Sequence, residues 1–246
     1  MEIAYLIDPD EKAVARKMDE VRRKTKGQFN TKGAADIREA LADKSVDAIS
    51  IATPNHWHSL MTIWGAQAGK HVYVEKPMSH DVHEGRVAVE AQRKYGVVIQ
   101  HGTQQRSSAS VAGLHEMINA GKFGKLKISY GYCCKPRGGI GFKSPSARPR
   151  TWTGTLWGGP AVIDTYQTTM CITMALVLGK TRERRPEQPR DAQLDVAVWG
   201  MDPSLTNPVR RWRSVAVFSG GIRGDAEHHV WYRRVPEWAD PVFQRS

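Results

Sequence analysis

Short apolar runs alternate with amphipathic segments through the first half of the chain. The apolar runs at residues 3–8 and Val46–Ala52 have the length and composition of buried strands, and the segments after them have helical spacing. The pattern predicts, in order, strand 3–8, a helix from Asp8-Pro9-Asp10 to about Lys26, helix 33–43, strand Val46–Ala52, helix 56–68, strand Val72–Val74, a helix capped by Ser79 and stopped by Gly96 after Tyr95, strand Val97–His101, and a helix from Ser107 or Ser108 to near Gly121. This alternation is typical of a doubly wound parallel sheet.

The pattern changes at Leu126. Lys-Ile-Ser-Tyr-Gly-Tyr predicts a longer alternating strand that begins a second domain, so we expect domains at 1–125 and 126–246. Regular periodicity then fades in 164–192 and again after about Arg210. Between these stretches, Gln193–Gly200 is predicted to be an amphipathic helix.

Composition limits the classes of protein to consider. At 246 residues, 40% hydrophobic and 25% charged, the chain can form one large domain or two modest ones. It has no apolar run of about 18–20 residues, which a membrane span needs. Its three cysteines and its histidines lack metal-ligand spacing, so we expect neither a metal site nor a membrane association.

The net charge of +11 raises the alternative of a nucleic-acid-binding module. The basic residues are scattered among acidic ones, and Arg22-Arg23-Lys24 closes a predicted helix, where cations complement the helix dipole. No helix-turn-helix, zinc-finger or RNA-recognition signature is present. We therefore expect no nucleic-acid partner.

Polar and ionisable side chains gather at the ends of two successive predicted strands. Thr53-Pro54-Asn55 follows one strand, and Glu75-Lys76-Pro77 follows the next. In an open parallel sheet, cofactors and substrates bind beyond the carboxyl ends of the strands. These two turns are therefore the candidate site.

The T-P-N-x-x-H stretch ending at His58, followed by Glu75-Lys76-Pro77, resembles the Gfo/Idh/MocA family of NAD(P)-dependent oxidoreductases. Residues 1 to about 145 share this resemblance. It implies a Rossmann domain followed by an α/β domain, and hydride transfer between NAD and a sugar, cyclitol or related polyol, with NADP as the alternative cofactor. Full-length relatives are expected to be homo-oligomers.

The resemblance implies a catalytic role for Lys76, since a partly buried lysine with a lowered pKa can take the substrate's hydroxyl proton. A surface lysine at a strand end is the alternative. It further implies that Glu75 lies near the nicotinamide ribose and that Pro77 fixes the backbone, where a cis Lys76–Pro77 bond is plausible.

The resemblance also implies that Thr53, Pro54 and Asn55 pack on the dinucleotide and that His58 completes this cofactor-binding turn, although a structural histidine at a helix terminus is the alternative. Asp8 would accept hydrogen bonds from the adenosine ribose, favouring NAD over NADP. The competing interpretation of Asp8 is a helix-capping acid.

Substrate contacts are expected from the segment after the strand Val97–His101. Gln104 and Arg106 resemble a family segment that carries a polar residue and an arginine near the active site. Arg106 could hold substrate hydroxyls or a carboxylate. A solvated loop arginine is the alternative.

The chain departs from the family pattern in several places. It contains no Gly-x-Gly-x-x-Gly turn, so we expect a Rossmann sheet that lacks its first β-α unit. The positions that match the second-domain catalytic pair are Gln188 and Ala192, so the proton-relay histidine is absent. We interpret 164–191 and 211–246 as disordered or out-of-frame sequence. A divergent, basic, loop-rich domain is the alternative.

The sequence therefore predicts a dehydrogenase of this family, and a catalytically inactive dinucleotide-binding fragment is the principal alternative. A cytoplasmic location is the default expectation. Export is expected if a signal peptide precedes the residues printed here.

Overall fold

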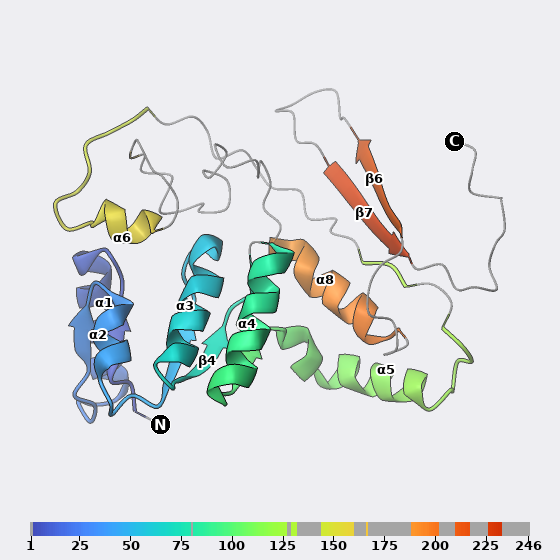
Figure 1. Ribbon diagram of the computed structural model, residues 1–246, viewed down its shortest axis with the longest axis horizontal. Coiled ribbons are helices and arrows are strands. Elements are labelled where there is room, and N and C mark those ends of the chain that lie inside the picture. Colours follow the sequence, from blue (N-terminus) through green and yellow to red (C-terminus); the bar gives the residue numbers. More distant parts are fainter. Residues whose placement is uncertain are drawn as a thin grey trace. The chain divides into compact units, whose positions relative to one another are not determined.

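The computed structural model describes residues 2–79, 81–126, 129–131, 144–159, 166, 188–201, 210–216 and 226–232 (Figure 1). Its contacts divide the chain into two units. The first contains residues 1–102 and 140–186, and the second contains 103–139 and 187–246. No helix in the described part is both long and apolar enough to cross a membrane.

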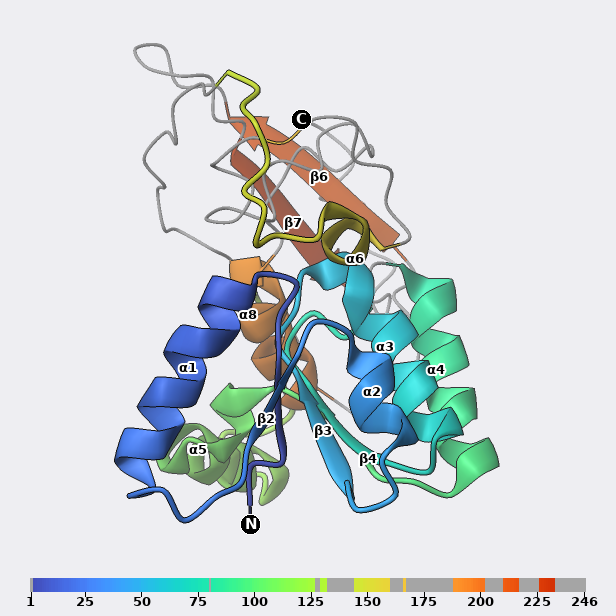
Figure 2. The same cartoon turned by 90° about the vertical axis from the view of Figure 1, so that its left-hand side faces the viewer.

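The first unit alternates strands and helices as the doubly wound pattern predicts. Its elements are β1 (Tyr5–Ile7), α1 (Glu11–Lys24), β2 (Lys32–Ala34), α2 (Ile37–Ala42), β3 (Ala48–Ile51), α3 (Asn55–Gln67), β4 (His71–Val74), α4 (Val82–Tyr95), β5 (Ile99–His101) and α6 (Gly154–Gly158). All the strand pairs of this unit are parallel. Figure 2 shows α1 on one side of the strands and α2, α3 and α4 on the other.

The parallel strands form two separate groups. β1 pairs with β2, and β3, β4 and β5 pair in that order, but among the described residues no ladder joins the two groups. Apolar packing connects them, because Tyr5 and Ile7 of β1 lie against a buried cluster that includes Ile49 and Ile51 of β3. The predicted parallel Rossmann-type sheet is confirmed, in two parts.

The expected helix 33–43 was wrong in its first residues. Lys32–Ala34 is the strand β2, and α2 begins only at Ile37 with Asp36 as its cap. A Lys-Gly-Ala strand has no apolar run that the sequence pattern could reveal. Gly33 is required there by packing, because a Cβ atom would lie 2.7 Å from Val14 Cγ1 and 2.8 Å from Met18 Sδ.

Two further boundaries differ from expectation. The cap of α4 is Asp81, whose side chain accepts the Glu84 N–H, rather than Ser79. At the predicted strand beginning with Leu126, residues 126 and 129–131 are not in a strand, and the others expected there lie outside the described residues.

The second unit has its own elements. These are the 3-10 helix η1 (Gln104–Ser107), α5 (Ala109–Asn119), α8 (Gln188–Trp199), β6 (Arg210–Ala216) and β7 (Ala226–Tyr232). β6 and β7 pair antiparallel. The predicted helix Gln193–Gly200 is present as part of the longer α8, whereas most of 164–191 lies outside the described residues.

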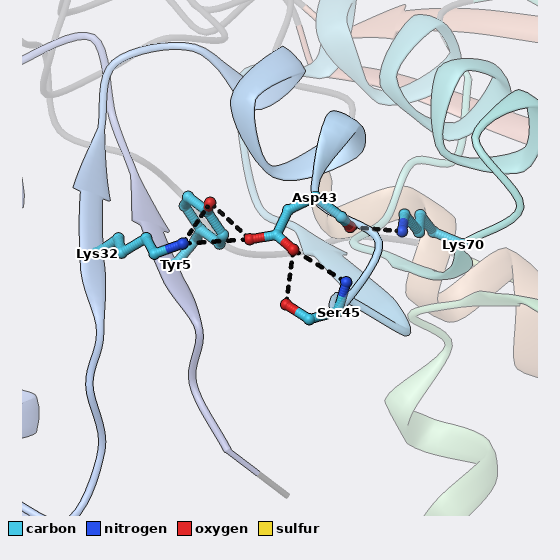
Figure 3. Close-up of polar contacts among 5 residues, drawn as sticks. All are labelled: Tyr5, Lys32, Asp43, Ser45 and Lys70. Carbon is cyan, nitrogen blue, oxygen red and sulfur yellow. Dashed lines mark hydrogen bonds and ion pairs between the residues drawn. The ribbon is translucent and has the colours of Figure 1, made fainter.

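A polar cluster around Asp43 joins the amino ends of the two strand groups (Figure 3). The Asp43 carboxylate accepts the Tyr5 hydroxyl at 2.9 Å and the Lys32 ammonium at 3.3 Å. It also accepts the hydroxyl and N–H of Ser45, and the buried Lys70 donates to the Asp43 carbonyl at 2.7 Å. The Ser45 donors first, then Tyr5 and Lys32, hold the pKa of Asp43 well below its usual range.

Asp43→Asn should be less stable than the wild type at neutral pH, because the cluster binds the ionised carboxylate. A lowered folded-state pKa stabilises the protein above the unfolded-state value of about 4, and this contribution is lost as the pH falls through the folded-state value. The stability difference should therefore shrink in acid, as measured by denaturant unfolding at several pH values. The exposed Asp47→Asn is the control, and an equal difference at every pH would contradict the role of the charge.

Candidate active site

The register of β3 with β4 places the two predicted turns at the same edge of the sheet. Ile51 is paired with Val74, so Thr53-Pro54-Asn55 and Glu75-Lys76-Pro77 leave neighbouring strands at the same level. The Glu75 N–H donates to the Ile51 carbonyl at 2.9 Å, which extends the ladder to the first residue of the second turn. All six residues are partly exposed at this edge.

The His58 ring contacts the backbone of both turns. It is in the first turns of α3 and only 1% exposed, with Nδ1 2.5 Å from the Pro77 carbonyl and Nε2 2.9 Å from the Thr53 carbonyl. Both partners are carbonyl oxygens, and a ring nitrogen donates to a carbonyl only where it carries a hydrogen. His58 thus contributes to the site by fixing the backbone of both turns.

The amino terminus of α3 lies at the same edge. Pro54 precedes the helix and provides no side-chain cap, so the first backbone N–H groups are directed towards the edge without a capping side chain. Such a helix terminus favours anionic groups. The Lys76–Pro77 peptide bond is cis, as the sequence interpretation considered plausible.

Asp8 lies in the turn between β1 and α1. One carboxylate oxygen accepts the Asp10 N–H at 2.9 Å, while Asp10 itself caps α1 by accepting the Lys12 N–H. Although the residue as a whole is exposed, desolvation of its carboxyl raises the pKa of Asp8, against the lowering effect of the Asp10 N–H. The helix cap is therefore Asp10, and Asp8 stabilises the turn before it.

Gln104 and Arg106 belong to the second unit, in η1. The Arg106 guanidinium makes a bidentate ion pair with Asp195 of α8, with Nε 2.9 Å and Nη2 2.6 Å from the carboxylate oxygens. This contact raises the pKa of Arg106. The group also lies 5.2 Å from the ring of Trp199. The sequence analysis did not anticipate this pairing.

The described side chains gather no group of three or more histidine, cysteine, aspartate or glutamate residues that could hold a metal ion. Of the residues that match the family's second-domain pair, Gln188 lies in α8 but its side chain is outside the described part, whereas Ala192 is described in the same helix.

The structure also shows contacts at this edge that sequence reasoning missed. Trp57, which the motif suggested to be a packing residue, donates from Nε1 to the Trp157 carbonyl at 3.0 Å, and His56 Nε2 lies 3.1 Å from the same oxygen. The tryptophan-rich composition after residue 150 was a signal, but not one that could identify the partners.

Comparison with known proteins agrees with this geometry. Residues 2–103 match the sequence model of the Gfo/Idh/MocA oxidoreductase family, described as having a NAD-binding Rossmann fold. A scyllo-inositol 2-dehydrogenase (NAD(+)) of Bacillus subtilis is 36% identical over 94 residues, which cover 38% of this chain and 28% of the relative. An inositol 2-dehydrogenase of Mycolicibacterium smegmatis is 36% identical over 92 residues, covering 37% and 27%.

Among solved structures, the WlbA dehydrogenase from Bordetella pertussis, in complex with NADH and UDP-GlcNAcA, is 27% identical with a TM-score of 0.45, covering 50% of this chain and 34% of that one. The matched segments thus span about a third of the relatives' length. Residues 2–103 thus resemble the NAD-binding Rossmann domain of the Gfo/Idh/MocA oxidoreductase family, whose sequence model they match.

Proposed function

We propose that this chain provides the cofactor-binding part of an NAD-dependent oxidoreductase that acts on a hydroxyl group of a sugar, cyclitol or related polyol. The observation that carries the proposal is the register of β3 with β4. Ile51 pairs with Val74, so the Thr53–Asn55 turn lies beside Glu75-Lys76-Pro77. The matched relatives include two named inositol dehydrogenases, which supports this substrate class.

The residues at this edge fit a dinucleotide. Glu75 would accept hydrogen bonds from the nicotinamide ribose, and Asp8 from the adenosine ribose. The amino terminus of α3, with the positive end of its helix dipole, favours an anionic part of the ligand. Bound NAD would supply the hydride acceptor.

Lys76 would exchange the substrate's hydroxyl proton from its Nζ atom, as a general acid–base group must when a carbinol is oxidised. His58 would keep Lys76 in place through the Pro77 carbonyl. Gln104 and Arg106, in the second unit, stay the substrate contacts that the family resemblance predicts, and Asp195 pairs with Nε and Nη2 of Arg106.

The proposal predicts saturable NADH binding that depends on Glu75. Glu75→Gln should weaken it by about threefold to tenfold, because glutamine keeps an acceptor oxygen but loses the charge that strengthens the hydrogen bonds. NADPH should bind more weakly than NADH, because its 2′-phosphate would approach the Asp8 carboxylate. Isothermal titration of the full chain measures both effects.

The exposed Glu90→Gln on α4 is the matched control for this titration. NADH binding with no turnover on a panel of inositols and anhydro-sugars would favour the inactive-fragment alternative. Absence of NADH binding would overturn the proposed function.

A further inference from the structure

The proposed dinucleotide site contains residues from turns that follow both strand groups, β1-β2 and β3-β4-β5. Asp8 follows β1, whereas the Thr53–Asn55 and Glu75–Pro77 turns follow β3 and β4. Among the described residues, no backbone ladder joins the two groups. Within the described residues, contacts other than strand ladders therefore link the Asp8 turn to the other site residues.

The segment Thr151–Gly159, here called the strap, contacts the first group at its carboxyl end. The Glu11 N–H donates to the Thr151 carbonyl at 2.9 Å, and the Thr153 N–H donates to the Pro9 carbonyl at 2.8 Å. These bonds flank an antiparallel bridge between Asp10 and Trp152. The strap is thus hydrogen-bonded to the turn that contains Asp8.

The same strap also contacts α3, the helix that follows β3 of the second strand group. The Trp157 carbonyl accepts Trp57 Nε1 at 3.0 Å and lies 3.1 Å from His56 Nε2. Trp57 and Trp157 are only 8% and 5% exposed. Gly159, at a φ of +51°, lies so close that a Cβ atom there would be 2.1 Å from Cζ2 of Trp57. Figure 2 shows α6, which contains Trp157, beside the end of α3.

The strap acts at the end of the strands opposite to the Asp43 cluster. That cluster joins the amino ends of the two groups, and the strap joins their carboxyl ends, where the site lies. Loosening the strap would therefore leave each turn folded on its own strands. It would remove one of the contacts that set the distance between the Asp8 turn and the Thr53–Asn55 turn, and would leave the apolar packing of β1 against β3 in place.

We propose that Trp57 is a positioning residue of the dinucleotide site and acts through the strap. The strap holds the Asp8 turn and the Thr53–Asn55 turn at the separation that one dinucleotide spans. The ligand class in this inference rests on the proposed function. A ligand that bridges two subsites gains affinity from their fixed spacing, whereas a ligand that fills one subsite does not.

The test compares a dinucleotide with its two halves. Trp57→Phe removes the Nε1–H, and Gly159→Ala forces the strap away from α3 without altering the helix. In both variants NADH affinity should fall by about tenfold or more, whereas the affinities for AMP and for reduced nicotinamide mononucleotide should be unchanged. Trp64→Phe is the control for ring packing, since Trp64 is on the same helix and its ring centroid lies 5.8 Å from that of Trp57, so this variant changes the packing but keeps the Trp57 Nε1–H.

A second measurement needs no ligand. Hydrogen exchange at the Glu11 and Thr153 amides should be faster in Trp57→Phe and Gly159→Ala than in the wild type or Trp64→Phe. Unchanged exchange, or equal losses of affinity for NADH and both mononucleotides, would overturn the positioning role alone. A wild-type chain that binds none of the three nucleotides would overturn the proposed function, and with it this role.

Discussion

Replacing His58 with phenylalanine should lower the free energy of unfolding by about 2–5 kcal/mol. The ring is 1% exposed, and it pairs with the carbonyls of Thr53 and Pro77. Phenylalanine fills similar space but takes a hydrogen-bond partner from the part-buried carbonyls of Thr53 and Pro77, at about 1–3 kcal/mol for each. Denaturant unfolding followed by circular dichroism measures the loss.

The matched control is His83→Phe on α4, because His83 is exposed. It should change the stability by less than about 0.5 kcal/mol. His58→Gln, which can restore one hydrogen bond, should fall between the phenylalanine variant and the wild type. A His58→Phe protein as stable as the wild type would show that the two turns are held by other contacts.

Lys76→Met should reduce turnover by about 10²–10⁴-fold, the usual contribution of a positioned acid–base group. Methionine keeps the length of the side chain but cannot exchange a proton. NADH affinity should change much less than turnover, because the lysine is proposed to act on the substrate hydroxyl. Steady-state NADH production with inositol substrates, together with NADH titration, separates the two effects.

Lys94→Met, on the exposed end of α4, controls for the loss of a positive charge. Equal losses in NADH affinity and turnover would instead make Lys76 a cofactor-binding residue. Wild-type turnover in the variant would contradict its proposed role.

Most of the first unit could be predicted from local sequence. The run Ala48–Ile51 is apolar and ends in a Thr-Pro-Asn turn, and His71–Val74 ends in Glu-Lys-Pro, so both strands and the site edge were predicted. The end of α4 followed from the stop at Gly96, and the start of α1 from Asp8-Pro9-Asp10, although the structure assigns the cap to Asp10. The strand Lys32–Ala34 could not be predicted from local sequence. The residues that pack on it at Gly33, Val14 and Met18, come from a different element of the chain.

By itself, the sequence determined the β-α order, the parallel class of the sheet and the turns that carry the candidate chemistry. These depend on hydrophobic spacing and turn residues within a few positions of one another. Only the tertiary structure decided that His58 faces two backbone carbonyls, that Arg106 pairs with Asp195, and that the Trp157 carbonyl receives Trp57. The reason is physical: a side chain's own sequence neighbourhood limits its partners, but which buried acceptor it meets depends on segments that folding brings together from far along the chain.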